Sequence, residues 1–143
     1  MAIQISHRAI QIDDIANILI SKEELALSEE ASQAILKCRK YLDEKINEEG
    51  AKYYGVNTGF GSLCDVEISK SEINQLQENL VMSHACGMGD EVPQEIVRIM
   101  LLLKIQSLSY GHSGAAIETV ERLIAMFNEN VLPVVYTQGS LGA

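Results

Sequence analysis

Tyr54 and His84 are the two residues of this chain whose types and settings could do chemistry on a ligand. Tyr54 precedes a segment with three glycines in seven residues, from Gly55 to Gly61. A phenol serves as an acid or base only where positive charge or hydrogen bonds lower its pKa from about 10. The alternative is that the ring fills a gap in a tight loop, and residue types alone leave both interpretations open.

His84 presents a similar choice at the end of a predicted helix. It follows Leu76 and Leu80 at helical spacing, so its imidazole lies on an otherwise apolar stripe. A polar ring at such a position needs a hydrogen-bond partner or a pocket. The periodicity by itself favours a hydrogen-bonded core histidine over a histidine that binds a ligand.

Several common sites are excluded by the residues that they would need. The Gly55–Gly61 segment lacks the Gly-Lys-Ser/Thr of a P-loop, and Gly87-Met88-Gly89 follows a predicted helix where a dinucleotide fingerprint follows a strand. Ser113 has its following glycine one place too early for a nucleophile elbow, so we expect it to cap a helix. The three histidines lack metal-ligand spacing. The sequence therefore predicts neither a nucleotide site nor a metal site.

Composition limits the class of protein. The 143 residues are 47% hydrophobic and 22% charged, which indicates a globular domain rather than a disordered chain. A formal net charge of −9 argues against binding to nucleic acid or to an anionic membrane. The longest apolar run, Ile99–Leu103, is too short for a membrane span, and the first residues do not resemble a secretory signal. We therefore expect a cytoplasmic protein whose widely spaced Cys38, Cys64 and Cys86 stay reduced.

Helical periodicity dominates, so the predicted fold class is mostly α. The predicted helices run from Ser28 to Gly50, from a Ser69–Glu72 capping box to Gly87, from Pro93 to Gly111 and from Ser113 to Asn130. Alternating isoleucines predict short strands at residues 3–5 and 10–12, and residues 131–135 are predicted to be extended. The helix after Pro93 is apolar nearly all round, so we expect another subunit or domain to bury it.

Three motifs together indicate a family. They are Tyr54–Gly61, Asn79–Gly89 and Gln138–Ala143. In this order and spacing they resemble the aromatic amino-acid ammonia-lyases, most closely the histidine ammonia-lyases. The resemblance extends through nearly the whole chain. It implies that residues 1–143 are the N-terminal domain of a several-fold longer, mostly helical bundle, with one or two short strands and a glycine-rich active-site loop.

The same resemblance implies where the electrophile of the reaction comes from. In this family an Ala-Ser-Gly triad cyclises to 4-methylideneimidazol-5-one (MIO), and Ala143 matches its first residue. Because the sequence stops before the serine and the glycine, we expect the 143-residue chain to be inactive by itself. The resemblance implies no dissociable cofactor and no metal. It also implies assembly as a homotetramer whose subunits share active sites.

Residue roles follow from the matched positions. Tyr54 matches the tyrosine that removes the substrate's β-proton. The Ser83–His84 pair matches the position that meets the substrate ring, and this reverses the preference for a core histidine at residue 84. The residues expected to line the same pocket are Asn57, Thr58 and Gly61. No role is assigned to Gln138.

These roles imply non-oxidative deamination of L-histidine to trans-urocanate and ammonia. An imidazole has a donor and an acceptor that a polar residue such as His84 can satisfy, whereas a phenylalanine ring favours an apolar pocket. The first alternative is an ammonia-lyase or aminomutase that acts on tyrosine or phenylalanine. The second is a catalytically inert helical fragment that binds partner chains.

Overall fold

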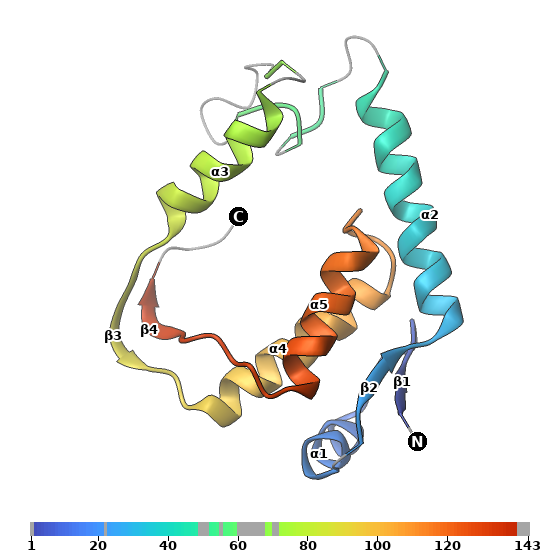
Figure 1. Ribbon diagram of the computed structural model, residues 1–143, viewed down its shortest axis with the longest axis vertical. Coiled ribbons are helices and arrows are strands. Elements are labelled where there is room, and N and C mark those ends of the chain that lie inside the picture. Colours follow the sequence, from blue (N-terminus) through green and yellow to red (C-terminus); the bar gives the residue numbers. More distant parts are fainter. Residues whose placement is uncertain are drawn as a thin grey trace. The chain divides into compact units, whose positions relative to one another are not determined.

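The fold is described from a computed structural model of the chain (Figure 1). The structure describes residues 2–21, 23–48, 52–54, 56–59, 68–69 and 72–139. The chain divides into two compact units. Unit 1 comprises Met1–Leu42 and Val92–Val135, and unit 2 comprises Asp43–Glu91 and Tyr136–Ala143. Each unit is therefore made from two separate stretches of sequence.

Unit 1 begins with a strand, a helix and a second strand. These are β1 (Ile3–Ile5), α1 (Ile12–Ile20) and β2 (Leu25–Leu27). The two strands pair in parallel, with Ile3 opposite Leu25 and Ile5 opposite Leu27. Parallel strands need a crossover between them, and α1 supplies it.

Three helices complete unit 1. They are α2 (Glu29–Ile46, of which the residues up to Leu42 belong to unit 1), α4 (Gln94–Ser109) and α5 (Ile117–Asn128). The helix α4 packs against α5, and α5 also contacts β2. Their shared core is apolar and includes Ile5, Ile35, Leu102, Ile105, Val120 and Phe127. Burial of this surface is the main force that stabilises unit 1.

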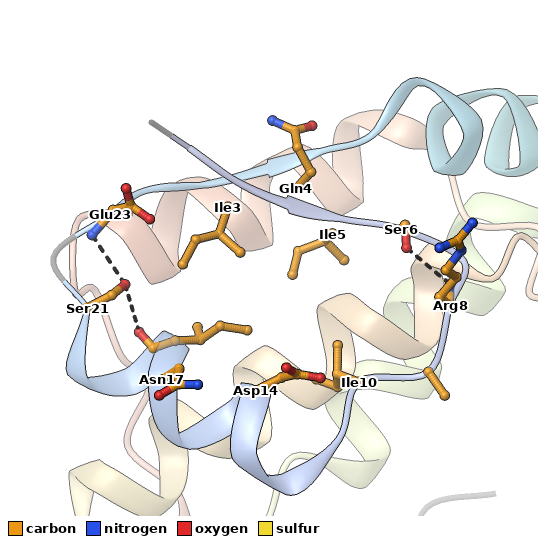
Figure 2. Close-up of a pocket in the computed structure, with 12 residues that line it drawn as sticks. Ile3, Gln4, Ile5, Ser6, Arg8, Ile10, Asp14, Asn17, Ser21 and Glu23 are labelled. Carbon is orange, nitrogen blue, oxygen red and sulfur yellow. Dashed lines mark hydrogen bonds between the residues drawn. The ribbon is translucent and has the colours of Figure 1, made fainter.

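A hydrogen-bonded clamp holds the turn between β1 and α1 against α4. The buried Gln106 amide donates from Nε2 to the carbonyls of Ser6 (3.0 Å) and Arg8 (2.8 Å). Ser109 Oγ donates to the same Ser6 carbonyl at 2.9 Å. Beside this turn, a cavity of about 490 Å³ lies between β1 and α1 (Figure 2). None of the predicted site residues lines this cavity.

Two of the predicted helix ends are confirmed. Ser28 caps α2, because its buried Oγ accepts the Ala31 N–H at 3.2 Å. At the other end of the core, α4 stops at Ser109 and Gly111 takes a positive φ of +69°. A side chain at Gly111 would place its Cβ 2.6 Å from the Ala34 backbone carbon. Glycine is therefore required there both by its backbone conformation and by the close approach of α2.

Other predicted boundaries are wrong. Residues 10–12 form no strand, because α1 begins at Ile12, where Asp14 Oδ2 accepts the Gln11 N–H at 2.9 Å and makes a capping box. Ser113 does not cap α5, since this helix begins at Ile117, after Gly114 has taken a φ of +68°. The strands β2, β3 and β4 and the helix α1 were not predicted.

The surface of α4 divides into a buried face and an apolar exposed stripe. Val97, Leu101, Leu102, Ile105 and Leu108 are buried. The exposed stripe consists of Ile96, Met100 and Leu103, at helical spacing. Burial of this stripe by another subunit or domain stays a prediction.

Unit 2 contains the end of α2, the helix α3 (Ile73–His84) and the strands β3 (Gly87–Glu91) and β4 (Tyr136–Gly139). The predicted start of α3 at Ser69 is wrong: the Ser69 hydroxyl bonds the Glu72 carboxylate, the Ser69 carbonyl accepts the Glu72 N–H in a turn, and the helix follows. The strands β3 and β4 are antiparallel, and both are exposed.

No helix in the described part of the chain is both long enough and apolar enough to cross a membrane.

Ser28 and Ser113 provide a matched test of helix capping. We expect Ser28→Ala to lower the free energy of unfolding by about 1 kcal/mol, because the Ala31 N–H loses its acceptor. We expect Ser113→Ala to change it by less than about 0.5 kcal/mol, because α5 begins further along the chain. Urea unfolding followed by circular dichroism measures both. Equal losses in the two variants would contradict the assignment of Ser28 as the cap.

Gly111→Ala is expected to destabilise the chain by more than about 1 kcal/mol, since alanine is strained at positive φ and its Cβ would meet Ala34. Gly111→Asn separates the two causes. Asparagine tolerates positive φ but also carries a Cβ, so we expect a loss similar to that of alanine. A near-neutral Gly111→Asn variant would show that the contact with Ala34 does not matter. The same urea titration measures both variants.

Candidate functional site

All the predicted site residues that the structure describes lie in unit 2. They are Tyr54, Asn57, Thr58, Ser83 and His84. Gly61 and Ala143 lie outside the described residues. Tyr54 directly precedes the glycine-rich segment, and Asn57 and Thr58 lie within it. Ser83 and His84 are the last two residues of α3.

Tyr54 sits inside a turn that is closed by hydrogen bonds between Tyr53 and Asn57. The Tyr53 carbonyl accepts the Val56 N–H at 3.0 Å and the Asn57 N–H at 3.2 Å. In the opposite direction, Asn57 Oδ1 accepts the Tyr53 N–H at 2.7 Å. Asparagine side chains commonly bond nearby backbone in this way, which makes them frequent in turns. These hydrogen bonds hold Tyr53, the residue directly before Tyr54.

The turn has a buried side and an exposed side. Asn57 and Thr58 are only 7% and 1% exposed, and the Thr58 hydroxyl donates to the Gly59 carbonyl at 3.0 Å. The Asn57 carbonyl accepts the Ile68 N–H at 3.0 Å, which ties the turn to the segment that precedes α3. Tyr54, by contrast, is 59% exposed. Tyr54 is therefore an exposed residue in a turn that also contains the buried, hydrogen-bonded Asn57 and Thr58.

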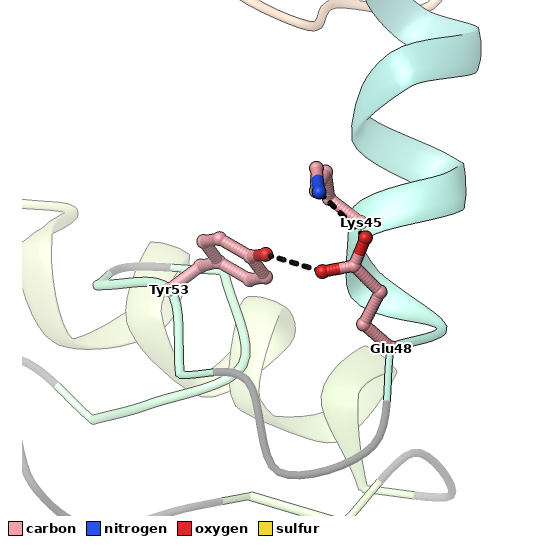
Figure 3. Close-up of polar contacts among 3 residues, drawn as sticks. All are labelled: Lys45, Glu48 and Tyr53. Carbon is pink, nitrogen blue, oxygen red and sulfur yellow. Dashed lines mark hydrogen bonds and ion pairs between the residues drawn. The ribbon is translucent and has the colours of Figure 1, made fainter.

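An exposed polar contact joins this turn to the end of α2 (Figure 3). The Tyr53 hydroxyl donates to Glu48 Oε2 at 3.4 Å, and Lys45 Nζ lies 2.5 Å from Glu48 Oε1. The hydrogen bond from Lys45, followed by the Lys45 charge and then the Tyr53 hydroxyl, lowers the pKa of Glu48 from 4.5 despite some desolvation. Glu48 is thus ionised at neutral pH. Exposed pairs of this kind stabilise a structure only slightly.

The end of α3 holds His84 in one orientation. Ser83 Oγ donates to the Leu80 carbonyl at 2.9 Å. His84 Nδ1 lies 2.9 Å from Ser83 Oγ and 3.0 Å from the same Leu80 carbonyl. A carbonyl oxygen can only accept, so Nδ1 carries a proton when it bonds the Leu80 carbonyl, whereas in the other tautomer it accepts from the Ser83 hydroxyl. With the proton on Nδ1, Nε2 is the hydrogen-bond acceptor of the ring.

His84 is exposed, so the interpretation as a core histidine is wrong for the described chain. The neighbouring residues of α3 explain the error. Leu76 and Leu80 are only partly buried, and Val81 and Met82 are exposed. Among the residues of unit 2 that the structure describes, Leu76 and Leu80 are therefore not part of a fully buried core.

The pairing of β3 with β4 places the third motif next to the second. Gly139 lies opposite Gly87, three residues after His84, and Gln138 lies opposite Met88. A Cβ on Gly139 would lie 3.0 Å from the Cys86 carbonyl, so the absence of a side chain permits this close approach. The structure therefore brings the Ser83–His84 end of α3 together with the strand that precedes Ala143.

The Tyr54 turn is tied to the other end of α3. Its hydrogen bond goes to Ile68, before the helix begins, whereas His84 ends the helix. With 12 residues at 1.5 Å each, α3 is about 18 Å long.

Sequence reasoning missed two features of the site: the acceptor role of the Asn57 side chain and the contact between Tyr53 and Glu48. The signal for the first was an asparagine within a glycine-rich turn, which favours side-chain bonding to the backbone. The second had no local signal, because it depends on where α2 ends.

The described residues bear on the sequence predictions about metal ligands and cysteines. No three His, Cys, Asp or Glu side chains among those residues gather closely enough to hold a metal ion. Cys38 is half-buried and Cys86 is exposed, and both are free thiols.

The sequence of this chain is similar to those of curated enzymes. The chain is 46% identical over 134 residues to a histidine ammonia-lyase from Caldanaerobacter subterraneus. The match covers 94% of this chain and 26% of that relative. It is 45% identical over 130 residues to a histidine ammonia-lyase from Bacillus subtilis, with 91% of this chain and 25% of the relative covered. The chain therefore spans about a quarter of the length of these relatives.

Solved structures agree on the fold. The histidine ammonia-lyase from Trypanosoma cruzi matches 98% of this chain and 27% of its own, with a TM-score of 0.83 and 30% identity. The tyrosine aminomutase from Streptomyces globisporus matches 98% of this chain and 26% of its own, with a TM-score of 0.87 and 25% identity. The mostly α fold class, that of the ammonia-lyases and aminomutases, is confirmed.

A family model described as aromatic amino acid lyase matches residues 10–143, which is most of the chain and includes all three motifs. The glycine-rich turn around Tyr54, the Ser83–His84 end of α3 and the strand that leads to Ala143 all fall within this match. The chain belongs to the aromatic amino acid lyase family.

Proposed function

We propose that the polypeptide to which these residues belong is a histidine ammonia-lyase, which converts L-histidine to trans-urocanate and ammonia. The observation that carries the proposal is the geometry of His84, whose Nδ1 is held by the Leu80 carbonyl and the Ser83 hydroxyl. The identity of 45% to 46% to relatives named histidine ammonia-lyase supports the same assignment.

The substrate preference follows from the acceptor that His84 presents. With the proton on Nδ1, the Nε2 atom can accept a hydrogen bond from the N–H of a substrate imidazole. A phenyl ring has no such donor, so it would leave the polar end of α3 unsatisfied. Sites built around a hydrogen bond discriminate strongly against analogues that lack the matching group.

Tyr54 is the proposed general base that takes the β-proton of the substrate. Its phenol is exposed while its backbone is held by the Tyr53–Asn57 hydrogen bonds. A base must reach within hydrogen-bond distance of the proton that it removes, and the exposure of the phenol leaves it accessible to a substrate. Closure of a substrate site over Tyr54 would also exclude water.

The remaining predicted residues keep narrower roles. Because the side chains of Asn57 and Thr58 are buried and bonded to the turn, they would line the pocket through their backbone. Gly61 is a predicted lining residue outside the described part of the chain. Unit 1 is not assigned a direct role in the chemistry.

The family chemistry calls for MIO, which would supply an electrophile for the substrate amine. Ala143 is the proposed first residue of the triad that forms it. The observation that supports this assignment is the close approach of Gly139 to the Cys86 carbonyl, which places the end of β4 beside the end of α3. Within this chain, the pairing of Gly139 with Gly87 holds β4 against β3.

Assembly and location are part of the same proposal. The exposed apolar stripe of Ile96, Met100 and Leu103 supports burial of α4 by further parts of a homotetramer. The net charge of −9 disfavours nucleic acid and anionic membranes as partners and fits a cytoplasmic enzyme of small molecules.

Tyrosine is the strongest alternative substrate. A phenol O–H could also donate to His84 Nε2, and the fold matches a tyrosine aminomutase with a TM-score of 0.87. Turnover of histidine, tyrosine and phenylalanine by the complete polypeptide separates these cases. Failure to turn over any of the three would contradict the proposed function. The remaining alternative, an inert helical fragment that binds partner chains, concerns residues 1–143 by themselves.

In the complete polypeptide, Tyr54→Phe should lower kcat on histidine by at least about 100-fold, because the base is lost. Substrate binding should be nearly unchanged, since the ring remains. The matched control is Tyr41→Phe, which removes a hydroxyl from a tyrosine of α2 that is 60% exposed, close to the 59% of Tyr54. Urocanate absorbance measures turnover. Wild-type turnover by Tyr54→Phe would exclude Tyr54 as the base.

His84→Leu should lower kcat/KM for histidine by roughly 10- to 100-fold, because the substrate N–H loses its acceptor. Its effect on phenylalanine should be neutral or favourable, since leucine makes the pocket apolar. The control is His112→Leu, which replaces an exposed histidine of unit 1 and should leave both rates unchanged. An equal loss for histidine and phenylalanine would remove the specificity argument.

A further inference from the structure

We propose that Asn57 is a positioning residue for the reaction: its side-chain oxygen, by accepting the Tyr53 N–H, holds the turn that presents Tyr54. This inference rests on the proposed function, in which Tyr54 is the base. It assigns Asn57 a different task from direct contact with the substrate. The acceptor oxygen, rather than the amide nitrogen, is the atom that matters.

The geometry around Tyr54 carries the argument. Two hydrogen bonds of opposite direction join Tyr53 and Asn57: Tyr53 N–H to Asn57 Oδ1 at 2.7 Å, and Asn57 N–H to Tyr53 O at 3.2 Å. Together they fix the two residues that flank the turn in which Tyr54 lies. The first bond is at the short end of the range for N–H···O bonds. Its acceptor is the side chain of Asn57, a residue that is only 7% exposed.

Asn57 also anchors the turn to the rest of unit 2. Its backbone carbonyl accepts the Ile68 N–H at 3.0 Å, so its N–H, carbonyl and side-chain oxygen all bond other residues. Removal of the side-chain oxygen would leave the Tyr53 N–H without this acceptor beside a buried residue, which is unfavourable.

The contact between the Tyr53 hydroxyl and Glu48 is weaker than the bond to Asn57. The Tyr53 hydroxyl reaches Glu48 at 3.4 Å, and this contact lies on the exposed surface, where polar pairs contribute little. The buried Asn57 bond is therefore a stronger constraint on Tyr53 than the contact with Glu48. A held turn reduces the entropy that the base would lose on reaching the reactive geometry.

Two substitutions separate positioning from substrate binding. Asn57→Asp keeps an oxygen at the position of Oδ1 and replaces the amide nitrogen. Asn57→Ala removes both. A residue that acts through its acceptor oxygen is rescued by aspartate, whereas a residue that binds substrate through its amide N–H is not. The control, Asn47→Ala, removes an exposed side-chain bond to the Asp43 carbonyl elsewhere in unit 2.

The first measurement is hydrogen exchange at the Tyr53 amide in the complete polypeptide. We expect exchange to become roughly tenfold faster in Asn57→Ala, as suits loss of one hydrogen bond, and to stay near the wild-type rate in Asn57→Asp and Asn47→Ala. Unchanged exchange in Asn57→Ala would overturn the proposed constraint. This readout does not depend on catalysis, so it stands or falls separately from the proposed function.

The second measurement is steady-state turnover of histidine by the same variants. We expect Asn57→Ala to lower kcat by roughly 10- to 100-fold with KM within about threefold of wild type, because a misplaced base slows the chemical step. Asn57→Asp should restore most of kcat. A loss in Asn57→Asp as large as in Asn57→Ala, or an effect confined to KM, would overturn the proposal.

If Asn57→Ala fails to fold, Asn57→Asp alone still decides the matter. Near wild-type kcat together with near wild-type exchange at Tyr53 supports positioning through the oxygen, and loss of either overturns it. If the wild-type polypeptide turns over none of the three amino acids, the proposed function fails, while the exchange result at Tyr53 still reports whether Asn57 holds the turn.

Discussion

The antiparallel pairing of β3 with β4 is the contact on which the candidate site depends. These strands are far apart in sequence, and their register sets Gly139 opposite Gly87. A Cβ at residue 87 would lie 2.5 Å from the Tyr136 ring, so any larger residue there would force this ring to move. The Val92 N–H bond to the Val135 carbonyl, 2.7 Å long, continues the pairing where the chain enters and leaves unit 1. The pairing thereby joins the end of α3 to the strand before Ala143.

The chemical groups of the site are exposed, whereas the backbone that carries them is bonded. Tyr54 is exposed in a turn that the buried Asn57 side chain stabilises. His84 is the last residue of a helix, and its Nδ1 contacts the Leu80 carbonyl. A group that must meet a ligand has to stay accessible, so its orientation is set by neighbours rather than by burial. The exposed stripe of α4 has a different cause, since apolar surface of that kind favours contact with other protein.

Much of the helical content could be predicted from local patterns. The cap at Ser28 and the glycine stop at Gly111 are short-range features, because each depends on a helix end and on a residue type that suits it. The short strands could not be predicted in the same way. Residues 10–12 alternate like a strand, yet Asp14 completes a capping box and the helix α1 begins at Ile12, whose side chain is exposed. Two- and three-residue patterns do not distinguish these outcomes.

The sequence by itself determined the family, through three motifs in order, and it determined which residue types could do chemistry, because phenol and imidazole groups near glycines are local facts. Only the tertiary structure decided that His84 is exposed, that its Nδ1 lies beside the Leu80 carbonyl, and that Asn57 turns its oxygen toward Tyr53. The physical reason is that burial and hydrogen-bond direction depend on groups brought together by folding, which periodicity along the chain does not encode.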